Sequence, residues 1–478
     1  MPDAELRQAS ASTRDRAAGD RMPAPARRVA FEILRAVNAG RDDLPALVAA
    51  ARERLSDPRD QALVAELTAG TLRWRGAVDH LLARYARRPL SKLDPPVLDS
   101  LRLGAYQLLH LDRVPARAAI SDAVDLVKAA RLSSAAGLVN AVLRAIDRDR
   151  DHLELPPDPG PGGARAAQLD HLSITLSHPR WLVERWLDRV GYVAARAWAT
   201  FNNGQAPLTL RVNTQVTTTG ALRDVLEAEG VRTEPTRHAP DGLIVQSGAP
   251  LTLPLAGSGA FFPQDEASQV VGAIAAAAAG RRILDVCASP GGKTLALAAA
   301  APEGSLVVAM DLRPRRVELL RRTVAASRAQ SIRLARADAL APLPFGAIFD
   351  LVLLDAPCSG LGTVRRDPEI RWRRTPDELA EFAAVQLRML RHAADVVRPG
   401  GRLVYATCSS EPDENDEVVS RLLAERPELA AVDPRTVCPV LPPSVAAALD
   451  PDGRLRTSPA GHNLEAFFAA MLVKRKHL

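Results

Sequence analysis

The chain has few cysteines and aromatic residues, and it has no long hydrophobic run. Cysteine occurs 4 times in 478 residues, which is too rare for a disulfide framework. No cysteine or histidine pair has zinc-ligand spacing. The apolar stretch at 270–279 is far shorter than the roughly 20 residues of a membrane span. Residues 1–22 lack the apolar core of a signal peptide. These absences favour a cytoplasmic, monomeric protein with no metal and no membrane partner.

The remaining composition is that of a globular protein with several domains. Hydrophobic residues make up 47% and charged residues 25% of the chain. The length predicts two to four domains, since single cores stop growing well below this size. The net charge of +6 is compatible with a nucleic-acid partner but does not establish one.

Changes in pattern along the chain divide it into five segments. Residues 1–22 are expected to be a disordered tail. Residues 23–150 have apolar residues at helical spacing with prolines between the helices, which predicts an all-α domain. Residues 151–168 are rich in proline and glycine and are interpreted as a linker. Residues 169–260 predict a small α+β module, and residues 261–478 a catalytic domain.

The last segment alternates apolar strands with helices. Strands are expected at 282–286, 305–311, 331–334, 350–355 and 402–407. Helices are expected between them, at 294–300, 314–327 and 376–397. This alternation is typical of a Rossmann-like α/β fold, with a mainly parallel sheet covered by helices on both faces.

A glycine-containing turn joins the first of these strands to its helix. The turn reads Cys287-Ala288-Ser289-Pro290-Gly291-Gly292-Lys293. It matches neither the dinucleotide-binding fingerprint nor a P-loop, and a glycine pair alone can be merely structural. Asp311 and Asp338 follow the next two strands, where either could instead be a turn residue. Together these strand ends predict an adenosine-containing cofactor at one edge of the sheet.

Two cysteines follow the ends of the fourth and fifth strands. Cys358 lies in Asp355-Ala356-Pro357-Cys358, and Cys408 comes directly after Thr407. A buried core cysteine is the alternative for either, and a redox disulfide for the pair. The chemistry that needs two thiols here is methylation of cytosine C5, in which a thiolate adds to C6 and makes C5 nucleophilic. Asp355 is suited to act at N3 of the base, and Lys293 to lower a thiol pKa or to orient the base.

The motifs resemble those of the Nol1/Nop2/Sun family of RNA 5-methylcytosine methyltransferases. The matching runs are DVCASPGGKT, DAPCSG and TCS, with Arg316 five residues after Asp311. The resemblance implies S-adenosylmethionine as cofactor, Cys408 as nucleophile and Cys358 as the helper that releases product. Relatives usually carry Asp-Gly-Phe-Phe near the C-terminus where this chain has Ala466 in place of glycine, which leaves that hairpin's geometry open.

The front half narrows the resemblance to one subgroup. Residues 101–109 and 139–144 resemble a NusB-like domain, and such a domain before this catalytic half is the layout of the RsmB (Sun) subgroup. The resemblance covers residues 24–478 and implies an RNA-binding front domain and 16S ribosomal RNA as substrate.

RNA contacts are predicted from two places in the chain. Arginines cluster around a tryptophan after the first cysteine motif, which suits phosphate contact and stacking on an unpaired base. A solvated basic loop with a packed tryptophan is the alternative. Arg211 and Asn213 resemble the subgroup's middle module. The predicted contacts are Arg211, Asn213, Arg365, Arg366, Arg371 and Trp372.

Other functions remain open. A transfer-RNA cytosine methyltransferase would use the same chemistry. A non-catalytic NusB-like RNA-binding factor would explain the helical front but not the intact cysteines. A small-molecule methyltransferase would explain the sheet but neither the cysteine pair nor the arginines.

Overall fold

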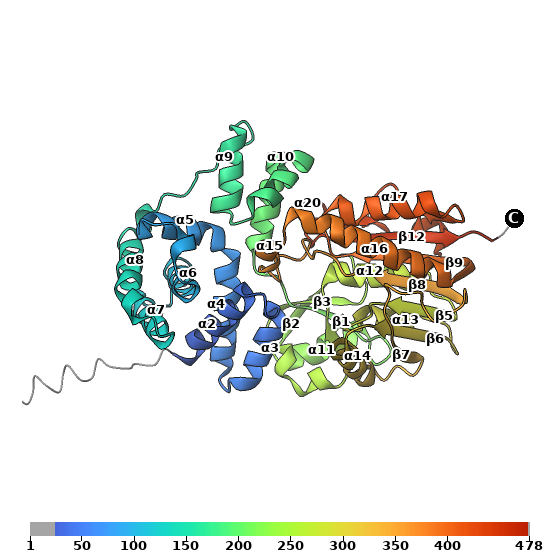
Figure 1. Ribbon diagram of the computed structural model, residues 1–478. Coiled ribbons are helices and arrows are strands. Elements are labelled where there is room, and N and C mark those ends of the chain that lie inside the picture. Colours follow the sequence, from blue (N-terminus) through green and yellow to red (C-terminus); the bar gives the residue numbers. More distant parts are fainter. Residues whose placement is uncertain (1–23, 477–478) are drawn as a thin grey trace, which may run out of the picture. The chain divides into compact units, whose positions relative to one another are not determined.

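The computed structural model describes residues 24–476, which form two compact units (Figure 1). The first unit contains the residues up to Asn203 together with Asp367–Trp372. The second contains Gly204–Arg366 and the residues from Arg373 onward. The tail expected at 1–22 lies outside the described residues.

The first unit is helical throughout, as the sequence predicts. Its main helices are α2 (Pro25–Asn38), α3 (Leu44–Arg54), α4 (Pro58–Arg73), α5 (Arg75–Ala86), α6 (Pro95–His110), α7 (Ala116–Ala129) and α8 (Ala136–Arg148). Prolines stand in the first turns of α2, α3, α4 and α6, where the missing N–H costs nothing. Asp43 and Asp57 cap the next backbone N–H groups of α3 and α4. The all-α prediction for this part of the chain is therefore confirmed.

The Pro/Gly segment and the helices after it also belong to the first unit. The His171 ring contacts the Pro156 carbonyl at 3.1 Å, and Gln168 Nε2 donates to the Gly160 carbonyl at 3.1 Å. α9 (Arg165–Asp170) begins inside the predicted linker, and α10 (Arg180–Asn203) follows, with a break in helical geometry at Gly191. The chain therefore divides at Asn203, within the segment 169–260 that the sequence assigns to one module.

The second unit begins with a small antiparallel sheet. Its strands β1 (Thr209–Val212), β2 (Arg232–Pro235), β3 (Gly242–Ser247) and β4 (Phe261–Pro263) have the order β2-β3-β1-β4. Helix α11 (Thr219–Ala228) packs Leu222 and Leu226 into the core of this sheet. The sequence pattern predicts strands at 208–212 and 242–245 and a helix at 220–228, which correspond to β1, β3 and α11. It misses β2, whose residues are mostly exposed and show no apolar pattern.

The large sheet is the Rossmann-like sheet that the sequence predicts. Its strands are β5 (Arg282–Val286), β6 (Leu306–Asp311), β7 (Ile332–Arg336), β8 (Phe349–Asp355), β9 (Val397–Thr407), β10 (Leu429–Val432), β11 (Leu455–Arg456) and β12 (Phe468–Lys474). The order is β10-β12-β9-β8-β5-β6-β7, with β11 on β12. From β9 to β7 neighbouring strands are parallel, and β12 runs antiparallel to β9.

Each face of this sheet packs against its own helices. Ile283 and Leu353 face a core shared with α12 (Glu266–Ala277) and α13 (Gly292–Ala300). Leu284 and Leu354 face a core shared with α16 (Pro376–Val396) and α17 (Asp416–Glu425). Because successive side chains of a strand alternate between faces, fully apolar strands fill both cores. α14 (Pro314–Ser327) adds Leu320 to the first core.

The C-terminal part, where the sequence pattern predicts no strand, completes the sheet. Ala466 is buried, and its N–H donates to the Gly362 carbonyl at 3.1 Å. The alanine in place of glycine is therefore accommodated in a regular backbone contact just before β12. No helix within residues 24–476 combines the length and apolarity that a membrane span needs.

Candidate active site

The carboxyl ends of the parallel strands bring the predicted site residues to one edge of the sheet. Strand order reverses between β5 and β8, since β6 lies on one side of β5 and β8 on the other. Open α/β sheets bind their ligands at such a switch point. The loop after β5, Asp311 at the end of β6, Asp355 at the end of β8 and Cys408 just after β9 all lie at this edge.

The loop after β5 is shaped by its glycines and by bonds to β6. Gly291 has φ +113°, and a Cβ there would lie 3.0 Å from a methyl carbon of Leu320, so glycine is required. The Ala288 N–H donates to the Met310 carbonyl at 2.8 Å. The Ser289 N–H donates to Asp311 Oδ2 at 3.3 Å. The loop, with the Ser289–Pro290 peptide bond cis, is therefore held against the end of β6 and leads into the N-terminus of α13.

Asp285 is a buried carboxyl at this edge that the sequence does not single out as a site residue. Thr294 Oγ1 donates to its Oδ2 at 2.5 Å, while Oδ1 has no hydrogen-bond partner within residues 24–476. Burial raises the pKa of Asp285 to about 7, with Thr294 and Lys293 opposing the shift and Asp355 and Asp311 adding to it. The unpartnered Oδ1 is an acceptor available for a ligand at the strand edge.

The other predicted cofactor residues surround this loop. Asp311 is 6% exposed, and its Oδ1 accepts a 3.4 Å hydrogen bond from the Arg313 N–H. Asp338 Oδ1 accepts from the Leu340 N–H at 2.9 Å, which is the turn contact that the sequence allows as an alternative. Cys287 is largely buried, and burial and nearby carboxylates raise its thiol pKa while Arg316 opposes them. Arg316 itself is exposed at the start of α14.

Lys293 and Asp355 form an ion pair between the loop and the cysteines. Lys293 Nζ lies 2.8 Å from Asp355 Oδ2, and it also donates to Ser268 Oγ at 2.8 Å. Burial tends to lower the pKa of Lys293, but Asp355, Cys408 and Asp285 outweigh it and the net pKa is raised. Lys293 is therefore an ammonium group at neutral pH. The role of Asp355 at N3 of the base stays a prediction.

The two cysteines lie in contact. Cys358 Sγ and Cys408 Sγ are 3.0 Å apart, although 50 residues separate them in the chain. Both residues are half-buried. The pKa of Cys358 is raised well above its ordinary value, first by its hydrogen bond to Cys408 and then by burial and by the charges of Cys408 and Glu414. Cys358 therefore holds its proton more tightly than an ordinary thiol does, and it can donate to Cys408.

The residues predicted to contact RNA are mostly engaged by the protein. Arg211 is 4% exposed, and its guanidinium donates to the Gly292 carbonyl at 2.8 Å. Asn213 is 2% exposed and donates to the Gly259 and Ser327 carbonyls. Burial leaves these two side chains no surface to offer a phosphate, so we do not assign them to RNA. They instead hold the small sheet against α13 and α14.

Arg365 and Arg366 are half-buried. Arg365 NH2 donates to the Gln205 carbonyl at 2.7 Å. Arg366 NH2 lies 2.7 Å from Asp265 Oδ2, and its Nε lies 3.1 Å from Glu465 Oε1. Both arginines hold the segment that follows Cys358 against other parts of the second unit. RNA contact by their exposed surface stays a prediction.

Arg371 and Trp372 belong to the first unit. Arg371 is fully buried and donates to the Ser177 and Asn202 carbonyls at 3.1 Å and to Asn203 Oδ1 at 2.9 Å. Trp372 Nε1 donates to the Leu72 carbonyl at 2.6 Å. Burial, with Arg73 adding to it, lowers the pKa of Arg371 to about 9. The expectation that Arg371 contacts RNA is not supported, because its donors are bound within the protein core. RNA contact by Trp372 stays a prediction.

Replacing Arg371 with alanine tests this reassignment. We expect the free energy of unfolding to fall by about 3 kcal/mol, because the change leaves buried carbonyls without donors. Arg117→Ala, at an exposed position on α7, should change it by less than about 0.5 kcal/mol. Urea denaturation measures both values. Unchanged stability with weakened RNA binding in Arg371→Ala would restore the RNA-contact interpretation.

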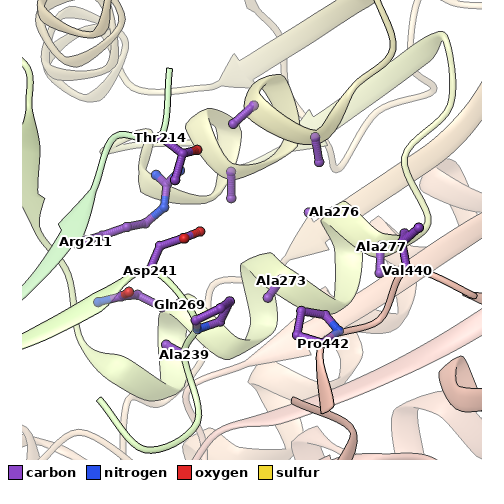
Figure 2. Close-up of a pocket in the computed structure, with 14 residues that line it drawn as sticks. Arg211, Thr214, Ala239, Asp241, Gln269, Ala273, Ala276, Ala277, Val440 and Pro442 are labelled. Carbon is purple, nitrogen blue, oxygen red and sulfur yellow. The ribbon is translucent and has the colours of Figure 1, made fainter. Parts of the chain in front are cut away.

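A separate pocket of about 400 Å³ lies between the small sheet and helices α12 and α13. Figure 2 shows Arg211, Thr214 and Asp241 at one side of it and Val440 and Pro442 at the other. The rest of its wall is largely alanine. The lining contains neither cysteine and neither member of the Lys293–Asp355 pair. We therefore assign the chemistry to the strand edge and not to this pocket.

The network around the cysteines also contains residues that the sequence alone does not identify. Ser268 on α12 accepts a hydrogen bond from Lys293. The two neighbours of Cys358 are also bound: Pro357 by Gln386 on α16, and Ser359 by Glu414 in the turn Pro412–Glu414. Two of them lie in runs that resemble family motifs: Glu414-Asn415 after the TCS motif, and Gln264-Asp265-Glu266-Ala267-Ser268 at the entry to the catalytic domain. Gln386 shows no signal within its helix. Among residues 24–476, no cluster of three or more His, Cys, Asp and Glu side chains is arranged to hold a metal ion.

Three family descriptions match consecutive parts of the chain. Residues 273–473 match the family described as 16S rRNA methyltransferase RsmB/F. Residues 24–148 match the NusB family, and residues 178–252 match a ferredoxin-like domain of RsmF/B-like methyltransferases. The catalytic sheet, the helical unit and the small sheet each have a counterpart among these matches.

Individual proteins match over most of their length. A probable ribosomal RNA small subunit methyltransferase B of Bacillus subtilis is 32% identical over 88% of this chain and 92% of its own. A putative methyltransferase of Mycobacterium tuberculosis is 38% identical over 94% of this chain and 96% of its own. The crystal structure of the protein PH0851 superposes with a TM-score of 0.76 at 25% identity, covering 95% of this chain and 100% of that one.

Proposed function

Because the chain belongs to the RsmB/F family of 16S rRNA methyltransferases, we propose that it methylates cytosine C5 in 16S ribosomal RNA. The membership makes the protein an RNA methyltransferase. The observation that supports cytosine C5 is the contact of Cys358 and Cys408, 3.0 Å apart, at the strand edge that holds the Lys293–Asp355 pair. The donors and acceptors of the proposed reaction lie on one chain, so the chemistry requires no second copy, and a cytoplasmic monomer is part of the proposal.

The strand edge fits S-adenosylmethionine as the cofactor. When bound, that cofactor supplies an electrophilic methyl group. Asp285 Oδ1 is a buried acceptor without a partner within residues 24–476, which suits an amino group. Asp311 at the end of β6 stands where doubly wound folds place an acid on ribose hydroxyls. Gly291 and Gly292 let the start of α13 pack closely against its neighbours, since a Cβ on Gly292 would lie 2.8 Å from Gln264.

Cys408 is the proposed nucleophile. Its thiolate adds to C6, forming an Sγ–C6 bond, and the C5=C6 electron pair moves toward N3 and O2. The Lys293 ammonium can donate a proton to this developing charge, while Asp355 accepts from the exocyclic amine of the base. Both groups are held before substrate arrives, so little reorganisation is required. C5 is then nucleophilic enough to take a methyl group.

Cys358 is the proposed helper in product release. After methylation the C5 proton leaves to water, the proton on N3 returns to Lys293, the C5=C6 bond forms again, and Cys408 departs as a thiolate. The Cys358 thiol lies 3.0 Å from that sulfur and can donate a hydrogen bond to the departing anion. Without this donor, the leaving group is poorer and the enzyme stays attached to RNA.

Bisulfite sequencing of ribosomal and transfer RNA tests the substrate. Cells with the gene should show a 5-methylcytosine in 16S rRNA that cells without it lack, and the gene expressed in trans should restore it. Loss of a transfer-RNA site with an unchanged 16S map would make the protein a transfer-RNA enzyme. Unchanged maps of both RNAs would remove the proposal.

A further inference from the structure

Each catalytic cysteine is followed by a serine, and the two serines meet. Ser359 follows Cys358 after β8, and Ser409 follows Cys408 after β9. Ser359 Oγ and Ser409 Oγ are 3.2 Å apart, and both serines are buried. The loops that carry the thiols are therefore joined one residue beyond the sulfur atoms.

A single carboxylate binds both serines. Glu414 Oε1 accepts from the Ser359 N–H at 2.8 Å, and Glu414 Oε2 accepts from Ser359 Oγ at 2.5 Å. Ser409 Oγ also donates to Oε2. Glu414 is fully buried. A buried carboxylate that accepts from hydroxyl and backbone donors fixes the donors around it.

The carboxylate is itself held from two further elements. Gln386 Nε2 on α16 donates to Glu414 Oε1 at 2.9 Å and to the Pro357 carbonyl at 3.0 Å. The Tyr405 hydroxyl on β9 donates to the Glu414 carbonyl at 2.6 Å. Helix α16 and the ends of β8 and β9 thus converge on this one residue.

We propose that Glu414 is a positioning residue that sets the contact between the two thiols and keeps the Cys358 sulfur protonated, so that Cys358 donates to Cys408. The proposal rests on the roles given to the cysteines above. Glu414 touches neither substrate nor cofactor in this scheme. It acts through Ser359 and Ser409, which it binds directly.

The charges around Cys358 favour this protonation state. Its pKa is raised first by the hydrogen bond to Cys408 and by burial, and then by the negative charges of Cys408 and Glu414, while the Gly360 N–H acts in the opposite direction. Tyr405 faces the same thiol from β9, and Lys293 faces Cys408 from α13. Glu414 is the carboxylate among these groups that binds both cysteine loops.

Neutralising the carboxylate tests the electrostatic part of the proposal. In a Cys408→Ser background, Glu414→Gln should move the pH profile of Cys358 alkylation down by about one unit, because a negative neighbour is lost. Peptide mass spectrometry follows Cys358 separately from Cys287 and Cys438. Glu266→Gln is the matched control: this buried carboxylate accepts a backbone N–H from His238 and should leave the profile unchanged. An unchanged profile in a folded Glu414→Gln protein overturns the proposal.

Cutting the bridge while keeping the charge tests the positioning part. Ser409→Ala should lower kcat for methyl transfer about tenfold and leave the KM for RNA unchanged, because the loop of Cys408 loses its tie to Glu414. When Ser409→Ala is introduced into the Cys408→Ser protein, the pH profile of Cys358 alkylation should match that of Cys408→Ser alone. Normal kcat in Ser409→Ala overturns the proposal, and this result decides it even if Glu414→Gln fails to fold.

These outcomes are separable from failure of the proposed function. Alkylation of Cys358 requires neither RNA nor cofactor, so the pH shift can be found even if the substrate is wrong. Conversely, if the Ser409→Ala variant methylates RNA normally, the proposed function stands and only the role of Glu414 is contradicted.

Discussion

Replacing Cys408 with alanine is expected to abolish methyl transfer to RNA, with kcat falling at least about a thousandfold. Cytosine C5 is not nucleophilic until a group adds to C6, and the Cys408 sulfur is the attacking atom in the proposed reaction. Cys358 lies 3.0 Å away, but its raised pKa means that it holds its proton more tightly than an ordinary thiol does. Cys358 is therefore a poor substitute for the Cys408 nucleophile. Transfer of labelled methyl groups to 16S rRNA measures the loss. RNA affinity, measured by filter binding, should change little.

Cys438→Ala is the matched control for this change. Cys438 is buried in the core, where its sulfur lies 3.9 Å from the Met471 sulfur, and it has no part in the proposed reaction. We expect its removal to leave methyl transfer near normal. Near-normal turnover by Cys408→Ala would instead show that the assigned chemistry is wrong.

Replacing Cys358 with alanine is expected to trap the enzyme on its RNA. Addition of Cys408 to C6 and methylation need no group from Cys358, but expulsion of the Cys408 thiolate loses its hydrogen-bond donor. Turnover should fall by about a hundredfold or more while a covalent protein–RNA adduct accumulates. Denaturing gel electrophoresis with labelled RNA detects the adduct as a species that survives detergent and heat.

The double variant Cys358→Ala/Cys408→Ala distinguishes this adduct from nonspecific attachment. It should form none, since the attacking sulfur is gone. An adduct of equal amount in the double variant would mean that another residue attacks the base. Free turnover by Cys358→Ala without an adduct would remove the release role of Cys358.

The sequence predicts the catalytic sheet well because its signals are local. The strands at 282–286 and 350–355 are short apolar runs bounded by turn residues, and the structure places β5 at Arg282–Val286 and β8 at Phe349–Asp355. Parallel strands send their carboxyl ends to one edge, so Asp311, Asp355 and Cys408 had to meet there. The strand order itself, with β8 beside β5, is a long-range property that the alternation of elements leaves open.

The sequence predicts partners of charged side chains poorly, because a partner is chosen by tertiary contacts. Arg371 looks like part of a solvated basic cluster, yet its donors bind Ser177, Asn202 and Asn203 inside the first unit. Glu414 follows the TCS motif as it does in relatives, but the sequence does not show that it is buried between two cysteine loops. The turn after β5 indicates a place for Lys293 at the strand edge, but its ion pair with Asp355 is a tertiary contact that the sequence does not show.

Trapping on a substrate analogue tests the central claim most directly. In 16S rRNA transcribed with 5-fluorocytidine, the C5 position carries no proton to lose after methylation, so the Sγ–C6 bond cannot be reversed by elimination. The wild-type enzyme, incubated with this RNA and S-adenosylmethionine, should form a stable adduct. Digestion and mass spectrometry should find the modified nucleotide on the peptide containing Cys408. An adduct on Cys358, or none while ordinary 16S rRNA is methylated, would contradict the mechanism.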